Sequence, residues 1–392
     1  MDPINFSALL TPKGQAVLEV ASALKPFEKD FLSHFQFLSK KFPKELARTA
    51  LSIAILRFEA EKKFPQAGEL YFTREALEQA TSWEVASYRA KRYAPFKQVL
   101  DLGCSVGSDS LTMAEHAKVT GIDLDPLRIA MANANANALN APANFIQADL
   151  HHLPLDISKI AKTAAFFDPA RRKNYRRVFN VEDYNPPLSI IKGWLPKIPA
   201  LGVKIAPGVN YDQLREYDYE IEFISLKGEL KEAVLWFGPL KLTQRRATLL
   251  PSGHSLTSEG PPPEIPLSNP KTYIFEPDPA ILRAGLVTTV ASQLNAEMLD
   301  PEIAYLTADK LTETPFARVW EVEDWLPFNL KKLRAYLRER NVGPLTVKKR
   351  RSPILPEDLI KDLNLKGDVE KVLFLTKIEE KPIVIVAKPE HK

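Results

Sequence analysis

The stretch from Val99 to Gly107 constrains the fold of this 392-residue chain more than any other. It reads VLDLGCSVG, in which apolar residues with strand propensity precede a turn that holds two glycines and three small residues. An apolar helical pattern begins at Leu111, so the order is strand, glycine-rich turn, helix. This order is typical of the first unit of a doubly wound α/β domain, where ligands bind at the carboxyl ends of the strands.

Acidic residues near this turn indicate which ligand it takes. The dinucleotide fingerprint G-x-G-x-x-G is interrupted, because Ser105 stands in place of the second glycine. Asp101 precedes the turn, where a carboxylate repels a pyrophosphate but suits the ammonium and sulfonium charges of S-adenosylmethionine. Asp123 closes the next apolar stretch, where an acid can bind both ribose hydroxyls. An ordinary strand-to-helix turn with a capping aspartate is the alternative. The expected S-adenosylmethionine site consists of Asp101, Gly103, Gly107 and Asp123.

Composition narrows the class of protein. The length suits two or three domains, and 45% hydrophobic with 26% charged residues is ordinary for a soluble globular protein. No apolar run approaches membrane-spanning length, and MDPINFSALL lacks the features of a secretory signal, so we expect a cytoplasmic protein. Cys104 is the single cysteine, which excludes a disulfide framework and a cysteine-based zinc site. His151 and His152 lack a third ligand nearby, so we expect no metal.

The chain divides into four expected regions. Residues 1–92 are mostly helical, with a clear helix at 44–63, and residues 93–250 alternate strands and helices around a seven-stranded, mostly parallel sheet. Residues 251–270 form an irregular proline-rich linker, and residues 271–392 form a region of α+β type. The expected strands of the sheet are 99–102, 119–124, 144–148, 164–167 and 201–206, followed by a hairpin of 220–226 and 232–237. The expected elements of the last region are a helix at 280–299 and a βαβαββ series of 316–322, 330–340, 345–349, 356–363, 372–376 and 383–387.

Further residues are candidates for contact with the cofactor. Asp149 ends the third expected strand, where it either accepts a hydrogen bond from the adenine amino group or caps the next turn. The segment before the first strand often folds over the cofactor in methyltransferases. We therefore also expect contacts from Phe72, Thr73 and Gln79.

The stretch FFDPARR, residues 166–172, ends the fourth expected strand with an acid and a proline. Base N-methyltransferases place an acid or amide, two prolines and an aromatic residue here, and the aromatic stacks on the base. Methyl transfer is an in-line displacement, so alignment of donor and acceptor is most of the catalysis. We expect Asp168 and Pro169 to hold the target amine, with Asp168 accepting its proton late. Arg171 either stacks on a base or pairs with Asp168 and blocks the site. A proline-terminated strand with a surface basic run is the alternative.

Two clusters of basic residues point to a phosphate-bearing substrate. Arg171, Arg172, Lys173 and Arg176 lie on the loop where a substrate would enter. A second cluster spans residues 331–351, where one basic surface suits sequence-independent contact with RNA, and an exposed solvated helix is the alternative. The residues of this cluster that we single out are Lys348, Lys349 and Arg350.

Longer motifs resemble a known group. LEQATSWEVASYRAKRY, VLDLGCSVGSDSL, GIDLDP and FFDPARR, together with FARVWEVEDWLPFNLKKL and VGPLTVKKR, resemble bacterial class I S-adenosylmethionine-dependent methyltransferases with a carboxyl-terminal THUMP-like domain. The resemblance implies a Rossmann-like core and a THUMP-like domain at about residues 316–392. Residues 71–171 more distantly resemble the core of trimethylguanosine synthase, which methylates an exocyclic guanine amine. Ala170 and Arg171 depart from that family's second proline and tryptophan.

These observations favour an S-adenosylmethionine-dependent methyltransferase that N-methylates a base in RNA. Two other hypotheses remain open at this point. One is a methyltransferase for a small molecule or a protein, and the other is a catalytically degenerate core that serves only to bind RNA.

Overall fold

The structure is a computed structural model that describes residues 1–153, 163–173, 176–258 and 260–389, without the side chains of 172–177. The chain forms two compact units. The first comprises Met1–Glu222 and Glu232–Leu242, and the second comprises Phe223–Lys231 and Thr243–Lys392.

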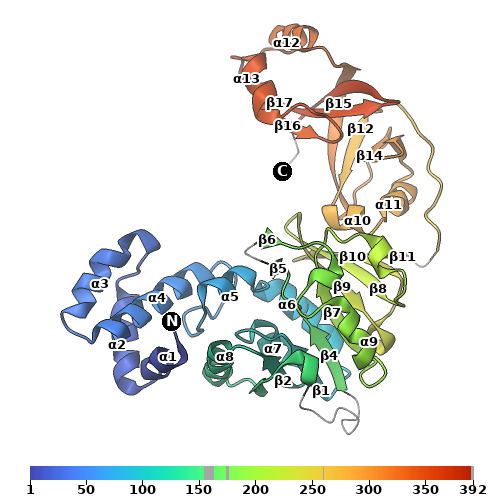
Figure 1. Cartoon of the computed structure of the whole chain (residues 1–392). Helices are drawn as coiled ribbons and strands as arrows, with labels where there is room; N and C mark the ends of the chain where they lie inside the picture. The colour runs from blue at the N-terminus through green and yellow to red at the C-terminus, as the bar shows by residue number, and fades with distance from the viewer. Residues whose placement is uncertain (154–162, 174–175, 259, 390–392) are drawn as a thin grey trace. The chain divides into compact units, whose positions relative to one another are not determined.

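Helices fill the amino-terminal part of the first unit, as predicted from the sequence (Figure 1). The helix expected at 44–63 is α4 (Lys44–Ala60), which buries Leu51 and Ile55 in a core shared with Leu127 and Met131 of α8 (Pro126–Ala138). Thr73 caps α5, because its hydroxyl oxygen accepts a hydrogen bond from the Ala76 amide. The helices are α1 (Pro3–Leu9), α2 (Pro12–Ala23), α3 (Phe31–Ser39), α4 (Lys44–Ala60), α5 (Arg74–Gln79) and α6 (Trp83–Ala90).

A nine-stranded sheet follows, in the order β11-β10-β8-β9-β7-β4-β1-β2-β3. The strands from β7 to β3 run parallel, and β9 runs antiparallel to β7. The carboxyl ends of β1, β2, β4 and β7 therefore meet at one edge of the sheet, where α/β proteins bind ligands. The elements are β1 (Gln98–Leu102), α7 (Ser108–Met113), β2 (Lys118–Asp123), α8 (Pro126–Ala138), β3 (Ala143–Gln147), β4 (Thr163–Phe167), β5 (Arg172–Lys173), β6 (Arg176–Arg177), α9 (Ile191–Trp194), β7 (Leu201–Ile205), β8 (Glu220–Leu226), β9 (Glu229–Trp236), β10 (Arg245–Leu250) and β11 (His254–Ser258).

The sheet has nine strands where the sequence analysis expected seven, because β10 and β11 extend it beyond β8. The expectation of an irregular linker at 251–270 is wrong for β11, which pairs antiparallel with β10 and buries Leu256. The reason is the distribution of the prolines. They stand at Pro251 and again from Pro261 onward, so His254–Ser258 contains none and keeps its backbone donors.

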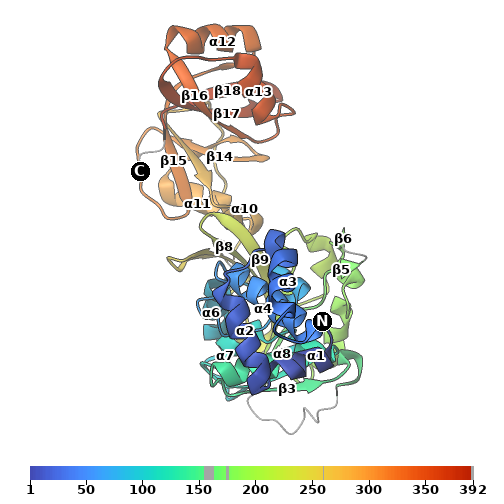
Figure 2. The same ribbon diagram turned by 90° about the vertical axis from the view of Figure 1, so that its left-hand side faces the viewer.

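The second unit contains a seven-stranded sheet in the order β13-β14-β12-β15-β18-β17-β16. Helices α12 and α13 cover one face of β16, β17 and β18, where Leu333 and Leu337 pack on Leu373 (Figure 2). The expected βαβαββ series is confirmed, but the prediction of a single helix over 280–299 is wrong. Gly285 has φ +68° and separates two short helices, and strand β13 follows them. The elements are β12 (Tyr273–Pro277), α10 (Pro279–Arg283), α11 (Val287–Leu294), β13 (Glu297–Asp300), β14 (Ile303–Ala308), β15 (Ala317–Pro327), α12 (Leu330–Glu339), β16 (Val342–Lys349), α13 (Pro356–Leu363), β17 (Val369–Ile378) and β18 (Lys381–Ala387).

Candidate active site

The turn after β1 holds both of its glycines in a conformation that other residues rarely adopt. Gly103 has φ +87° and Gly107 has φ +83°. A Cβ atom at Gly103 would lie 2.8 Å from the backbone oxygen of Asp168, so the turn packs directly on the residue that follows β4. The amides of Gly103 and Cys104 both donate to the Ile122 carbonyl, at 2.8 and 3.0 Å. Bare backbone is thus fixed at the edge where β1, β2 and β4 end.

Asp123 joins this turn to the end of β2. Its two carboxylate oxygens accept hydrogen bonds from the backbone amides of Ser105 and Asp125, each at 2.9 Å. Each carboxylate oxygen has a second lone pair, so a rigidly held Asp123 can still accept from hydroxyl groups. Leu124 next to it is 65% exposed, which places an apolar surface beside the acceptor. The sequence analysis did not single out Leu124, although an apolar residue directly after a strand-ending acid was an available signal.

Asp101 is held by α7. The residue is 1% exposed, and its carboxyl accepts a hydrogen bond from the Ser110 hydroxyl, which joins β1 to α7. Burial raises the pKa of Asp101 to about 8, and the neighbouring Asp109 carboxylate adds to the rise. A contact of Asp101 with the charges of the cofactor stays a prediction.

Asp149 lies after β3 and is exposed. Its carboxylate accepts a hydrogen bond from the His151 amide at 2.9 Å, and this bond lowers the pKa of Asp149. The capping role that the sequence left open is therefore present in the structure. A contact with adenine stays a prediction.

The segment before α5 is fastened to the glycine-rich turn. The buried Asn135 side chain of α8 accepts from the Tyr71 amide at 2.7 Å and donates to the Val106 carbonyl at 2.9 Å. The expected contact from Phe72 is corrected, since this residue is 1% exposed and packs on Phe64. Thr73 serves as the cap of α5. Gln79 is exposed and donates to the Glu75 carboxylate at 3.1 Å within the same helix.

Asp168 carries the clearest chemistry of this edge. Its Oδ2 accepts from the Lys204 ammonium at 2.8 Å, and the Arg171 guanidinium lies 4.0 Å from Oδ1. Burial raises the pKa of Asp168, but Lys204 and then Arg171 outweigh burial and hold the pKa below its ordinary value. Within the described ranges, no donor lies within hydrogen-bond distance of Oδ1. Asp168 is therefore ionised at neutral pH and can only accept hydrogen bonds. Pro169 next to it is buried.

Lys204 is the residue of this site that the sequence analysis overlooked. It lies in β7 with a side chain that is 5% exposed, and its ammonium also donates to the Thr81 hydroxyl at 2.8 Å. Thr81 follows α5, so the segment before the first strand does reach the site, through Thr81 rather than Gln79. The available signal was a lysine inside the apolar run LGVKIA, since a buried ammonium requires a partner.

The basic loop after Asp168 contains a short antiparallel pairing. In its described backbone, Arg172 pairs with Arg177 and Lys173 with Arg176. The side chains of Arg172, Lys173 and Arg176 lie outside the described residues. The side chain of Arg171 is described and is 19% exposed.

The three residues singled out in the second basic cluster do not share one surface. Alternation along β16 puts Lys348 and Arg350 on one face, where both pair with Glu276 at 2.6 and 3.6 Å. Lys348 also lies over the Trp320 ring and Arg350 over the Tyr305 ring. Lys349 alone of the three is exposed. The expectation of a shared RNA surface at these three residues is therefore corrected.

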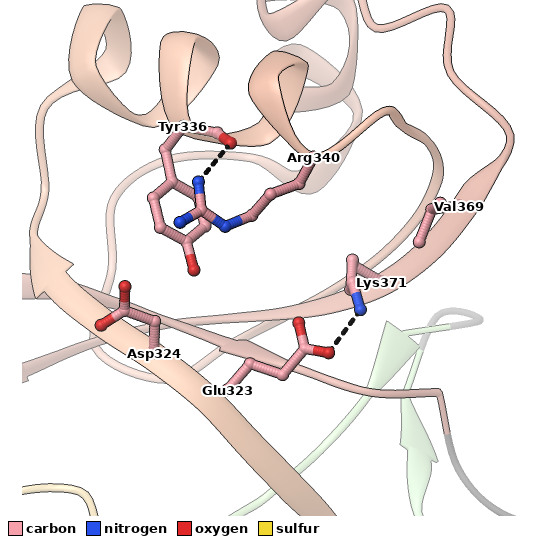
Figure 3. A pocket seen from close by; sticks show the side chains of 6 residues that line it. All are labelled: Glu323, Asp324, Tyr336, Arg340, Val369 and Lys371. Carbon is pink, nitrogen blue, oxygen red and sulfur yellow. Dashed lines mark hydrogen bonds and ion pairs between the residues drawn. The ribbon is translucent and has the colours of Figure 1, made fainter.

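A hollow of about 360 Å³ lies in the second unit beside α12. Figure 3 shows that its charges are mixed: Lys371 pairs with Glu323 at 2.6 Å, and the Arg340 guanidinium lies over the Tyr336 ring. Asp324 adds a second carboxylate to its wall. Such a lining is not the single-sign surface that phosphate contact favours.

None of the helices in the described parts of the chain has the length and apolar character that crossing a membrane requires. Over the same ranges, no group of three or more His, Cys, Asp or Glu side chains is arranged to hold a metal ion.

Three family models match this chain. A methyltransferase domain matches residues 99–180, a THUMP domain-like model matches 317–389, and a domain of unknown function matches 2–60. An uncharacterized S-adenosylmethionine-dependent methyltransferase of Mycobacterium tuberculosis is 35% identical over 312 residues, which cover 78% of this chain and 84% of the relative, in each of two strains. A crystal structure from Porphyromonas gingivalis W83, of a protein assigned to the methyltransferases, has a TM-score of 0.76 and 22% identity and covers 94% of this chain and 100% of that one.

Proposed function

The chain belongs to the family of S-adenosylmethionine-dependent methyltransferases, and from this premise we propose that it transfers the methyl group to a nitrogen of a base in RNA. The cofactor supplies an electrophilic methyl group on a sulfonium. The observation that carries the proposal is the ionised Asp168 at the edge where the glycine-rich turn ends, with one carboxylate oxygen 4.0 Å from its nearest described cation.

The residues around the glycine-rich turn fit the cofactor. Gly103 and Gly107 leave room for close approach to backbone, and Asp123 is a fixed acceptor for ribose hydroxyls beside the apolar Leu124. Asp149 follows β3, the strand that pairs with β2, and is the proposed acceptor for the adenine amino group. Asp101 contributes to this site by fixing β1 to α7.

Asp168 positions the acceptor nitrogen. As an acceptor-only carboxylate, it receives an N–H from the target amine at Oδ1 and leaves the nitrogen lone pair aimed away from itself. When the new N–C bond forms, the amine loses a proton, which Asp168 takes late or passes to water. Lys204 keeps Asp168 ionised and fixes Oδ2, so the carboxylate cannot turn freely. These roles of Asp168 and Lys204 suit an exocyclic amine as the methyl acceptor. Trimethylguanosine synthase methylates such an amine, and residues 71–171 of this chain distantly resemble its core.

The ion pairs of Asp168 argue against the alternative of a catalytically degenerate core that only binds RNA. A core that only binds RNA would be favoured by an Arg171 locked onto Asp168, yet 4.0 Å separates these groups, and the close partner is Lys204 on the other oxygen. This geometry supports an enzyme. The neutralised cluster at Lys348 and Arg350 favours the remaining alternative, a small-molecule or protein substrate.

We expect Asp123→Ala to weaken S-adenosylmethionine binding about 10- to 100-fold, because hydrogen bonds to a charged acceptor contribute about 1.5–3 kcal/mol. Isothermal calorimetry with the full chain measures this directly. Asp183→Ala is the matched control, since Asp183 is exposed and lies outside the turn. Unchanged affinity in a folded Asp123→Ala variant would remove Asp123 from the cofactor site.

For RNA, we propose contact through the exposed start of α12. Lys331 and Lys332 are both exposed there, in contrast to the paired Lys348. We expect Lys331→Ala combined with Lys332→Ala to lower the slope of log Kd against log salt by about two, because each lost phosphate contact removes about one unit. Fluorescence anisotropy with a labelled RNA hairpin measures the slope, with Lys348→Ala as control. Salt-independent binding, or none, would favour the non-RNA substrates.

Label transfer tests the reaction itself. The protein is incubated with radiolabelled S-adenosylmethionine and total RNA from a strain that lacks it, and the labelled nucleoside is then identified. A methylated base nitrogen supports the proposal, whereas label only in protein or in small molecules overturns the choice of RNA.

A further inference from the structure

We propose that Phe179 is the stacking platform for a planar heteroaromatic acceptor, in place of the aromatic residue that the stretch after Asp168 lacks. This inference rests on the proposed function and narrows the substrate to an aromatic ring that bears an amine. Its starting point is Phe179, a large apolar side chain that is 58% exposed. Single exposed apolar side chains are common on protein surfaces, so it is the place of this ring beside a polar site that points to ligand contact.

Backbone pairing brings Phe179 back to the Asp168 motif. The hairpin pairs Arg172 with Arg177, and the Val178 amide donates to the Arg171 carbonyl at 2.9 Å. One further step along this antiparallel register sets Phe179 opposite Ala170, two residues after Asp168. Ala170 itself is exposed and pairs on its other edge with Asn185. Related motifs carry a proline at the position of Ala170 and an aromatic at that of Arg171, so this chain lacks both and places Phe179 across the hairpin from Ala170.

A second element places the same ring at the same edge. The Phe179 ring lies 3.5 Å from where a Cβ atom of Gly208 would be, so it rests on a residue without a side chain. Gly208 follows β7, the strand whose Lys204 binds Asp168. The ring therefore lies at the carboxyl end of the strands that carry the proposed acceptor group.

The segment after Phe179 is anchored. The Asn180 side chain accepts from the Glu182 amide at 3.1 Å, and the Val181 amide donates to the Gln213 side chain at 3.0 Å. Val181 is fully buried. An exposed ring on an anchored backbone is preorganised, so little ordering cost opposes stacking.

The chemistry of the neighbours fits one class of ligand. Phe179 offers a π face, Asp168 accepts from an amine N–H, and the Arg171 guanidinium, 4.0 Å from Asp168, can lie along a second face or bind an anionic group. A lysine side chain would satisfy Asp168, but it would gain a cation–π contact with Phe179 only as the ammonium, the form that has no lone pair to accept a methyl group. An amino-substituted nucleobase satisfies both.

The test uses 2-aminopurine riboside, whose fluorescence is quenched by stacking, with full-length protein saturated with S-adenosylhomocysteine. We expect quenching by the native protein, a Kd about tenfold higher for Phe179→Leu, and near-native binding for Phe179→Trp. Phe37→Leu is the matched control, because Phe37 is an exposed ring of α3 (42%) away from this edge. Melting curves confirm that each variant is folded.

The outcomes separate this inference from the proposed function. If the native protein methylates RNA but Phe179→Leu binds the riboside and methylates RNA with native KM, the stacking role of Phe179 is overturned while the function stands. If the native protein transfers no label to RNA, the proposed function is overturned, whatever the Phe179 variants show. Riboside quenching that is lost in Phe179→Leu and kept in Phe37→Leu supports the platform in either case.

Discussion

Asp168→Asn is expected to lower kcat for methyl transfer about 10²- to 10³-fold, the scale on which losing one preorganised polar contact acts in an active site. Asparagine keeps the shape of the side chain and one acceptor oxygen. The Lys204 ammonium, however, stands 2.8 Å from Oδ2 and has no acceptor capacity of its own. It will claim that oxygen and turn the new amide nitrogen toward the substrate. Two N–H donors then face each other, and the acceptor amine is repelled.

We expect a second substitution to restore part of the activity that Asp168→Asn loses. Adding Lys204→Met to Asp168→Asn frees the amide to turn its oxygen to the substrate, so kcat should recover about tenfold from the single variant. Single-turnover label transfer measures both variants, and Asp212→Asn, an exposed acid paired with Arg215, is the control. An additive further loss in the double variant would contradict the proposed orientation of Asp168, because the two residues would then act independently.

Much of the fold could be predicted from the sequence because its signals are local. Helical spacing over 44–63 predicts α4, and VLDLGCSVG predicts the first strand and turn; the structure confirms both. The errors arose where averaged composition hid local order. Proline content over 251–270 concealed β11, and apolar spacing over 280–299 concealed Gly285, whose positive φ divides the helix.

The candidate site was harder to predict, because contacts between distant segments decide it. Asp101 and Asp168 are both acids after or within apolar strands, yet one is buried against Ser110 and has a raised pKa, whereas the other faces Lys204 and has a lowered pKa. Sequence spacing cannot separate these outcomes. The partner Lys204 lies 36 residues from Asp168 and on another strand. For the same reason the basic run in β16 was misjudged, since Glu276 lies 72 residues away from Lys348.

We expect Lys204→Met to make activity and stability change in opposite directions as the pH rises. In the native protein, burial is the largest influence on the pKa of Asp168 and raises it, but Lys204 together with Arg171 and Arg89 outweighs burial, so the carboxylate stays ionised across neutral pH. Removing the ammonium takes away the largest of the opposing charges, so we expect burial to dominate and the folded-state pKa to rise above the unfolded value. Ionised Asp168 then becomes scarce at low pH. We expect the acidic limb of the kcat profile to move upward, with activity at least tenfold below native at pH 6 and closer to native at pH 9.

Stability should move in the opposite direction. A carboxyl whose folded pKa is depressed contributes stability above its unfolded pKa, and this contribution is lost as the pH falls through the folded value. In Lys204→Met the folded pKa is raised instead, so the folded state binds more protons and its stability declines as the pH rises above about 4. Thermal melts at pH 5 and pH 8 should therefore show the variant losing more Tm relative to native at pH 8, where its residual activity is higher. Lys192→Met is the matched control, because Lys192 pairs with Glu216 at the same 2.8 Å but both side chains are exposed. If activity and Tm fell in parallel at every pH, Lys204 would be a structural residue alone, since a general loss of fold cannot make activity rise while stability falls.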